Sequence, residues 1–150
     1  MKKISSVENV LFYQKIYDAL STISPVPIEF VKSTLIKDGE YNSHKQVIYI
    51  HDGMSQTQTM KVCFREVVRA IYYSEDLKDE NDGMEKEREI ESIVFLICKD
   101  LGVDAPRPLG ECEEINRKAD EIINRMEATI RILNWEEFEK EITEDCEYFY

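Results

Sequence analysis

The chain has 150 residues with a formal net charge of −12, and 43% of its residues are hydrophobic. This length and composition predict one folded domain over residues 1–150 and exclude a wholly disordered acidic chain. The charge argues against direct binding to nucleic acid or to an anionic membrane, so we expect neither.

The first elements expected along the chain are a helix and two strands. Residues 7–23 carry apolar side chains at helical spacing, and a Ser-Pro-Val-Pro segment ends this helix. β-branched and aromatic residues predict strands at 28–36 and 45–51. Asp38 and Gly39 between them are typical of a hairpin turn, so we expect the two strands to pair with each other.

A long amphipathic helix is expected next. Ser55 or Thr57 is placed to cap it, and an acidic loop at 75–83 ends it. Val62, Tyr72 and Tyr73 lie on the side opposite the main apolar stripe, so we expect both sides of this helix to be covered. The main stripe consists of Met60, Cys63, Phe64, Val67, Val68 and Ile71.

The rest of the chain predicts further helices. One runs from 85 to 101 and ends at Gly102, and another covers 111–133. Residues 134–150 are expected to form an acidic amphipathic C-terminal helix. The expected fold class is therefore α+β: an N-terminal helix, a short β-hairpin or sheet, and then three to four helices.

The pentapeptide at 65–69, Arg-Glu-Val-Val-Arg, has the spacing of the HExxH motif of zinc proteases. In that motif two histidines bind zinc and the glutamate activates a water molecule. Arg65 and Arg69 occupy both histidine positions, and a protonated guanidinium has no lone pair for a metal. We therefore expect no metal and no cofactor. Glu87 continues the apolar stripe of its helix, and we expect it to pair with Arg65 or Arg69.

Several segments around the pentapeptide occur in a characteristic order and spacing. They are the strand 46–50, the polar approach Gln56-Thr57-Gln58-Thr59, the helix 64–70, the segment 87–98, Leu101-Gly102-Val103-Asp104, and 119–123. Together they resemble the zincin-like domains of the ImmA/IrrE and ArdC-like antirestriction group, which are common on phages and conjugative elements. The resemblance implies a zincin-like fold in which Glu66 is at the position of the catalytic base and Glu87 at that of the third zinc ligand.

The expected function follows from this resemblance and from the charge. It is a catalytically inactive zincin-like protein of a phage or mobile element that acts by binding a basic nucleic-acid-binding host protein through an acidic surface. An example would be the inhibition of a host defence nuclease, as in antirestriction or anti-CRISPR proteins. Residues 75–91 hold nine acids against three bases, and residues 136–150 hold seven acids against one lysine. The residues expected to meet the partner are Glu136, Glu137, Glu139, Glu141, Glu144, Asp145, Glu147, Asp76, Asp79, Glu80 and Asp82.

Other interpretations remain open. The chain could be a divergent metallopeptidase with a rearranged site, or a regulatory or structural subunit that docks through its aromatic tail. The pentapeptide and Glu87 are also compatible with an ordinary charged helix surface, and the acidic tail with a solubilising helix face. His44 and His51 flank the second strand, where exposed loop residues are common.

Cysteine usage and the N-terminus predict a cytoplasmic protein. The four cysteines are far apart and form no CxxC pair, which suits reduced thiols. The first residues, Met-Lys-Lys-Ile-Ser-Ser, lack a hydrophobic signal region. The sequence does not indicate an oligomeric state.

Overall fold

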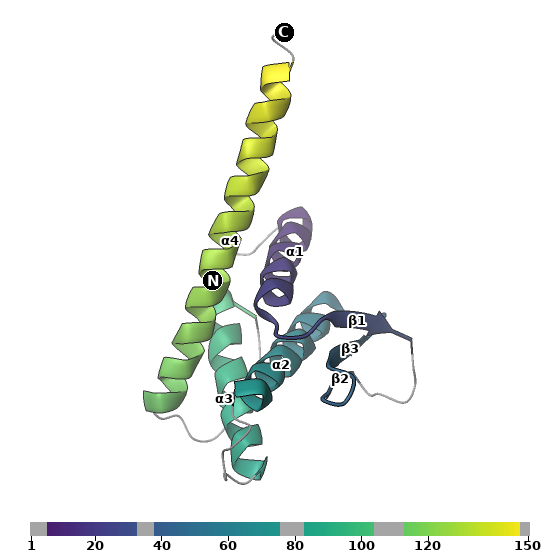
Figure 1. The fold of residues 1–150 in the computed structure, drawn as a ribbon, viewed down its shortest axis with the longest axis vertical. Helices are drawn as coiled ribbons and strands as arrows, with labels where there is room; N and C mark the ends of the chain where they lie inside the picture. Colours follow the sequence, from purple (N-terminus) through teal and green to yellow (C-terminus); the bar gives the residue numbers. More distant parts are fainter. Residues whose placement is uncertain (1–5, 33–37, 76–82, 104–112, 148–150) are drawn as a thin grey trace.

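The computed structural model describes residues 6–32, 38–75, 83–103 and 113–147, with side chains described within 13–32, 38–74, 86–103 and 113–132. Within these ranges the chain has the expected α+β class, with four helices and one three-stranded sheet (Figure 1). The elements are α1 (Ser6–Ile23), β1 (Ile28–Val31), β2 (Gly39–Asn42), β3 (Val47–His51), α2 (Gln56–Glu75), α3 (Gly83–Leu101) and α4 (Glu113–Glu147).

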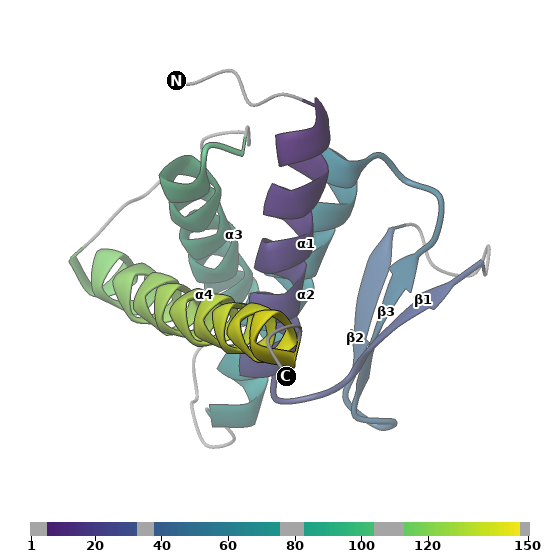
Figure 2. The ribbon, with the colours of Figure 1, turned by 90° about the horizontal axis from the view of Figure 1, so that it is seen from above.

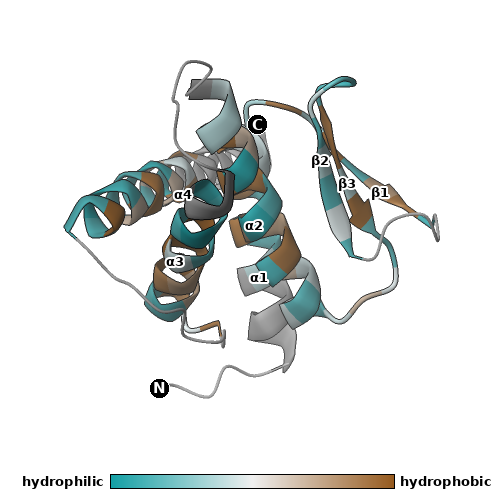
Figure 3. Cartoon of the chain, turned by 90° about the horizontal axis from the view of Figure 1, so that it is seen from below, coloured by the Kyte–Doolittle hydropathy of each residue, from teal (hydrophilic) through white to brown (hydrophobic). Residues whose placement is uncertain are grey.

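Helix α2 is the centre of the arrangement. It packs against β2 and β3 on one side and against α1 and α3 on the other, while α4 packs on α1 and α3. The helices all lie on the same side of the sheet (Figure 2). Apolar and polar stretches alternate along α2, α3 and α4, as expected of helices that bury one face (Figure 3). The core includes Leu20, Ile48, Ile50, Phe64, Val67, Ile90, Ile93 and Ile97, all fully buried or nearly so.

The sheet pairs the two predicted strands with each other, but in parallel and not as a hairpin. Its order is β1-β3-β2, with β1 parallel to β3 and β2 antiparallel to β3. The hairpin therefore joins β2 to β3, and the expectation of a hairpin between 28–36 and 45–51 was wrong. Asp38 and Gly39 do not make its turn, because Gly39 is already the first residue of β2. Residues 33–37 lie outside the described part of the chain.

The turn of the observed hairpin is built by Asn42. Its side-chain oxygen accepts hydrogen bonds from the backbone N–H groups of His44 (3.1 Å) and Lys45 (3.0 Å). This is the local bonding by which asparagine favours turns. Gln46, the last residue of the loop, has a φ of 53°, in the left-handed region. The predicted strand at 45–51 therefore began two residues too early, because β3 begins at Val47.

Glycine at position 39 allows β2 to lie close to α2. A Cβ atom there would overlap Val62 Cγ1 and would lie 3.3 Å from Ile50 Cδ1. Val62 is 1% exposed, so it has little room to move aside. The close contact places the backbone of β2 within hydrogen-bonding distance of the α2 side chains described below.

The helix ends follow their predicted signals. Ser55 caps α2, since its hydroxyl accepts the N–H of Gln58 at 3.2 Å. Gly102 has a φ of 73° and ends α3 in a Schellman arrangement, in which Val103 N–H donates to Cys98 C=O at 2.8 Å. Val62 and Tyr72 are buried, as expected for a helix covered on both sides.

Helix α4 is longer than predicted. The sequence favoured separate helices at 111–133 and 134–150, but one helix of 35 residues runs through both from Glu113 to Glu147. Its C-terminal part extends beyond the other elements (Figure 1). None of the helices in the described ranges has the length and apolar character needed to cross a membrane.

Candidate functional site: an arginine–carboxylate network

The motif residues lie on the stripe of α2 that faces β2 and α3. Val62 packs under Gly39, and Glu66, Arg69 and Tyr73 continue from it at helical spacings of four, three and four residues. Because this stripe runs between two neighbouring elements, its polar members find partners on both. Glu66 is fully buried, and the side chains of Arg65 and Arg69 are 29% and 24% exposed.

Glu66 is the centre of the network. Its Oε1 accepts a hydrogen bond from Arg65 Nε at 3.0 Å. Its Oε2 accepts hydrogen bonds from Arg69 Nη1 at 2.7 Å and from the backbone N–H of Tyr41 at 3.0 Å. Arg69 Nη1 also contacts Oε1 of Glu66. A buried carboxylate is stable only when its charge is paired and its oxygens are hydrogen-bonded, and both conditions hold here.

Arg65 turns toward the sheet. Its Nη2 and Nη1 donate to the two carboxylate oxygens of Asp38 at 2.6 Å and 3.1 Å. The hydrogen bond from Arg65 lowers the pKa of Asp38 below its ordinary value, and that same bond raises the pKa of Arg65. Sequence reasoning assigned Asp38 only to a turn, so this member of the site was missed.

Arg69 turns toward α3 and pairs with Glu87. Its Nη2 and Nε donate to the two oxygens of Glu87 at 2.7 Å and 3.2 Å, and the hydroxyl of Tyr73 donates to Oε1 at 3.3 Å. Burial lowers the pKa of Arg69, but its bonds with Glu87 and Glu66 outweigh burial and raise it. The predicted pairing of Glu87 is confirmed for Arg69, whereas Arg65 pairs with Asp38 and Glu66 instead.

The surroundings of Glu66 differ from those that the HExxH motif gives its glutamate. Glu66 is fully buried, and its oxygens accept hydrogen bonds from two guanidinium groups and a backbone N–H. Among the described residues, no three His, Cys, Asp or Glu side chains gather as a metal site would require. His44 is exposed in the hairpin loop and His51 is half-buried at the end of β3.

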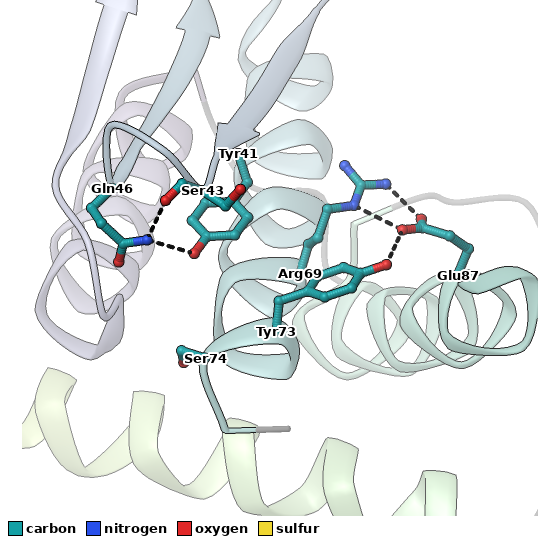
Figure 4. Close-up of a pocket in the computed structure, with 7 residues that line it drawn as sticks. All are labelled: Tyr41, Ser43, Gln46, Arg69, Tyr73, Ser74 and Glu87. Atoms are coloured by element: carbon teal, nitrogen blue, oxygen red, sulfur yellow. Dashed lines mark hydrogen bonds and ion pairs between the residues drawn. The ribbon is translucent and has the colours of Figure 1, made fainter. Parts of the chain in front are cut away.

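A cleft of about 610 Å³ adjoins the network on the side of the hairpin loop. Figure 4 shows how its lining converges from three parts of the chain. The hydroxyl of Tyr41 accepts a hydrogen bond from Gln46 Nε2 at 3.4 Å, while the hydroxyl of Tyr73 reaches Glu87. The lining residues are Tyr41, Ser43, Gln46, Arg69, Tyr73, Ser74 and Glu87. Among them, the sequence analysis predicted only Arg69 and Glu87 as site residues, and it named Tyr73 only as part of a covered helix face.

The predicted acidic residues are not brought to this site. Glu136, Glu137, Glu139, Glu141, Glu144, Asp145 and Glu147 fall on the C-terminal part of α4, where the helix is described but the side chains are not. The predicted loop acids Asp76, Asp79, Glu80 and Asp82 lie outside the described residues.

Comparisons with known proteins leave the family open. A scan against protein-family models, a search of curated proteins and a search of solved structures each give no match. The resemblance to zincin-like domains therefore stays a prediction that rests on the sequence segments and on the geometry of residues 65–69 and Glu87.

Proposed function

We propose that this chain is a zincin-like scaffold without metal or hydrolytic activity, and that it acts by binding a protein. The network carries the proposal, because the groups at the positions of a base and a third ligand are held by arginines. In such a site guanidinium replaces zinc as the local positive charge. Ion pairs that stabilise the fold therefore occupy the positions that a zinc protease uses for catalysis.

The proposed partner is a basic protein that binds nucleic acid, such as a host defence nuclease. The support is the charge of the chain, −12, together with the extension of α4 beyond the packed body. Seven acids against one lysine in residues 136–150 give that end of the chain a strongly negative field, which would steer a basic groove toward it. The choice of a defence protein comes from the family resemblance.

A reducing cytoplasm suits this proposal. Cys63 and Cys98 are free and buried, and burial raises the pKa of their thiols to about 12 and about 11. Thiols of this kind stay protonated and unreactive at neutral pH. Their contribution is packing within α2 and α3 rather than chemistry.

Affinity capture from host lysate, repeated over a range of salt concentrations, tests the proposal. We expect a basic protein to be retained at low salt and released as ionic strength rises, because surface charges more than a Debye length apart are screened. Retention that does not depend on salt, or the absence of a retained protein at any salt, would contradict the proposal.

The metallopeptidase alternative makes separate predictions. It requires stoichiometric bound zinc in the purified protein and a peptidase activity that is lost in Glu66→Gln. Elemental analysis of the wild-type chain checks the first directly. Bound zinc at one equivalent would overturn the proposal of a metal-free scaffold, whatever the result of the capture experiment.

A further inference from the structure

Helix α4 carries two apolar stripes that fall on opposite sides of the helix. The first faces the core between α1 and α3. Its members are Ile115, Ala119, Ile122 and Met126, all of them buried. The second, called the distal stripe below, consists of Trp135, Phe138 and Ile142. At about 100° per residue, the distal stripe falls about half a turn around the helix axis from the first.

Exposed residues in the first half of α4 mark the side on which the distal stripe falls. Trp135 and Phe138 follow Arg131 by four and seven residues, so they continue its line along the helix. The members of that line before the distal stripe are Arg117, Asn124, Ala128 and Arg131, all of them exposed. Ile132, one turn before Trp135, is 59% exposed. The line therefore points away from the core, along a helix whose end extends beyond the other elements (Figure 1).

The borders of the distal stripe are acidic. By helical position, Glu139 lies along one side of the stripe and Asp145 along the other. Residues 136–150 hold seven acids against one lysine, so a second copy of this helix would bring like charges together. The surface that complements the stripe is apolar in its middle and positively charged along its borders.

We propose that the distal stripe docks onto an apolar face of the protein partner that lysine or arginine borders, as on a basic amphipathic helix. The inference rests on the proposed function and names the contact that it uses. The acids attract and orient the partner, whereas the apolar residues supply most of the affinity. An amphipathic helix that lays its apolar face against an apolar surface is a recurring mode of recognition, and tryptophan is a common anchor in it.

Trp135 provides the test, because it is the only tryptophan of the chain and its fluorescence reports on the distal stripe alone. The probe is a blocked peptide of about 14 residues, or four helical turns, made of lysine and of leucine at helical spacing. In the free full-length chain we expect acrylamide to quench Trp135 efficiently. Titration with the peptide should shift the emission saturably to shorter wavelength and reduce the quenching, because docking covers the indole.

Two control peptides separate the apolar contact from the charge. A peptide of the same composition in scrambled order keeps the charge but has no apolar face. It should bind at least about tenfold more weakly. A peptide with glutamate in place of every lysine keeps the apolar face and reverses the charge. It should not bind at low salt, because its charges repel those beside the stripe.

Two variants locate the contact. Phe138→Ala/Ile142→Ala keeps Trp135 and every charge, and alanine favours the helix. It should weaken binding of the lysine–leucine peptide at least about tenfold, because most of the apolar area of the stripe is removed. Phe30→Ala is the control, since it removes a 44% exposed aromatic side chain from β1 and should leave binding unchanged. Circular dichroism confirms that each variant is folded.

Four results would overturn the inference. Trp135 resistant to acrylamide in the free monomer would show that the stripe is covered by its own chain, and resistance that grows with protein concentration would show that a second copy covers it. Equal binding of the scrambled peptide would show that charge alone acts. Full binding by the folded Phe138→Ala/Ile142→Ala variant would place the contact elsewhere.

Failure of this inference is distinct from failure of the proposed function. A basic host protein that the Phe138→Ala/Ile142→Ala variant captures at full strength refutes the stripe but not the function. Peptide docking at Trp135 without any captured host protein refutes the function but supports the stripe.

Discussion

Two charged regions of this molecule differ in how their charges are matched. In the network on α2, each guanidinium bonds two carboxylates, and the central Glu66 is fully buried. In the C-terminal part of α4, seven acids stand against a single lysine along a helix that extends beyond the body. In the network the positive and negative charges almost cancel. The C-terminal part of α4 has a large excess of negative charge.

The contrast separates charge that stabilises the fold from charge that is available to a partner. Buried pairs are screened little by salt, and removing one member leaves the other charge unpaired in a low dielectric. Exposed like charges contribute little to stability and repel one another, but they attract a basic surface over about 10 Å. Substitutions in the two regions should therefore affect different measurements.

The largest loss of stability is expected from Arg69→Met. The methionine keeps much of the apolar stem but leaves Glu66 with one guanidinium and Glu87 with none. We expect the free energy of unfolding to fall by about 3–5 kcal/mol, as is usual when one partner of a buried ion pair is removed. Denaturant unfolding measures the change.

Arg117→Met is the matched control for this variant. Arg117 pairs with Glu121 one turn along α4 at 2.8 Å, with both side chains 61% exposed. Its loss should cost no more than about 0.5 kcal/mol. Equal losses in the two variants would show that the network contributes no more than a surface pair.

A smaller loss is expected from Gly39→Ala, which tests the close contact that brings β2 to the network. The new Cβ overlaps Val62 Cγ1, so the strand must move away from α2. We expect a loss of about 1–3 kcal/mol in the free energy of unfolding. In the double variant Gly39→Ala/Val62→Ala, the cost should be less than the sum of the single costs, because the clash is removed. Additive costs would contradict the proposed overlap.

Asp38→Asn should have a moderate effect that depends on pH. The pKa of Asp38 is lowered in the folded chain, so its stabilising effect is present above the ordinary value near 3.8 and is lost as pH falls through the lower folded pKa. The stability difference between wild type and Asp38→Asn should therefore be constant from about pH 5 to 7 and shrink below about pH 4. Carboxyl NMR titration in Arg65→Gln provides the check, since the pKa of Asp38 should return toward its ordinary value.

The sequence predicted the helices and part of the site, because these depend on local patterns. Apolar spacing defined α2 and α3, Gly102 marked the end of α3, and helical geometry brought Glu87 to Arg69. The extent of α4 was misjudged because the change in composition near Asn134 was taken for a boundary between two helices. The helix continues there because no strong helix breaker separates its two parts.

The parallel orientation of the two predicted strands and the partner of Arg65 could not be obtained in this way. A parallel β1–β3 pair depends on contacts between distant residues, and the turn signal at Asp38 was stronger than the one at Asn42. Because no strand was predicted at 39–42, Asp38 could not be assigned to Arg65. The asparagine whose side chain accepts two backbone N–H groups was the available signal for the correct turn.

The smallest change in stability is expected from truncation after Asn134, which removes the acidic end of α4. The packed part of α4 remains, with Ile122 and Met126 buried in the core. We expect the free energy of unfolding to change by no more than about 0.5 kcal/mol, because the removed part extends beyond the body. Capture of the basic partner should nevertheless be lost.

Charge and shape of that end are separated by a second variant of full length, Glu137→Gln/Glu141→Gln/Glu144→Gln. It keeps the helix but removes three of the seven acids in residues 136–150. If attraction to a basic surface dominates, the partner should be released at lower salt than from wild type, because fewer charges must be screened. A truncated chain that fails to fold would instead show that the end of α4 belongs to the core. The distinction between charge that stabilises the fold and charge that is available to a partner would then not hold.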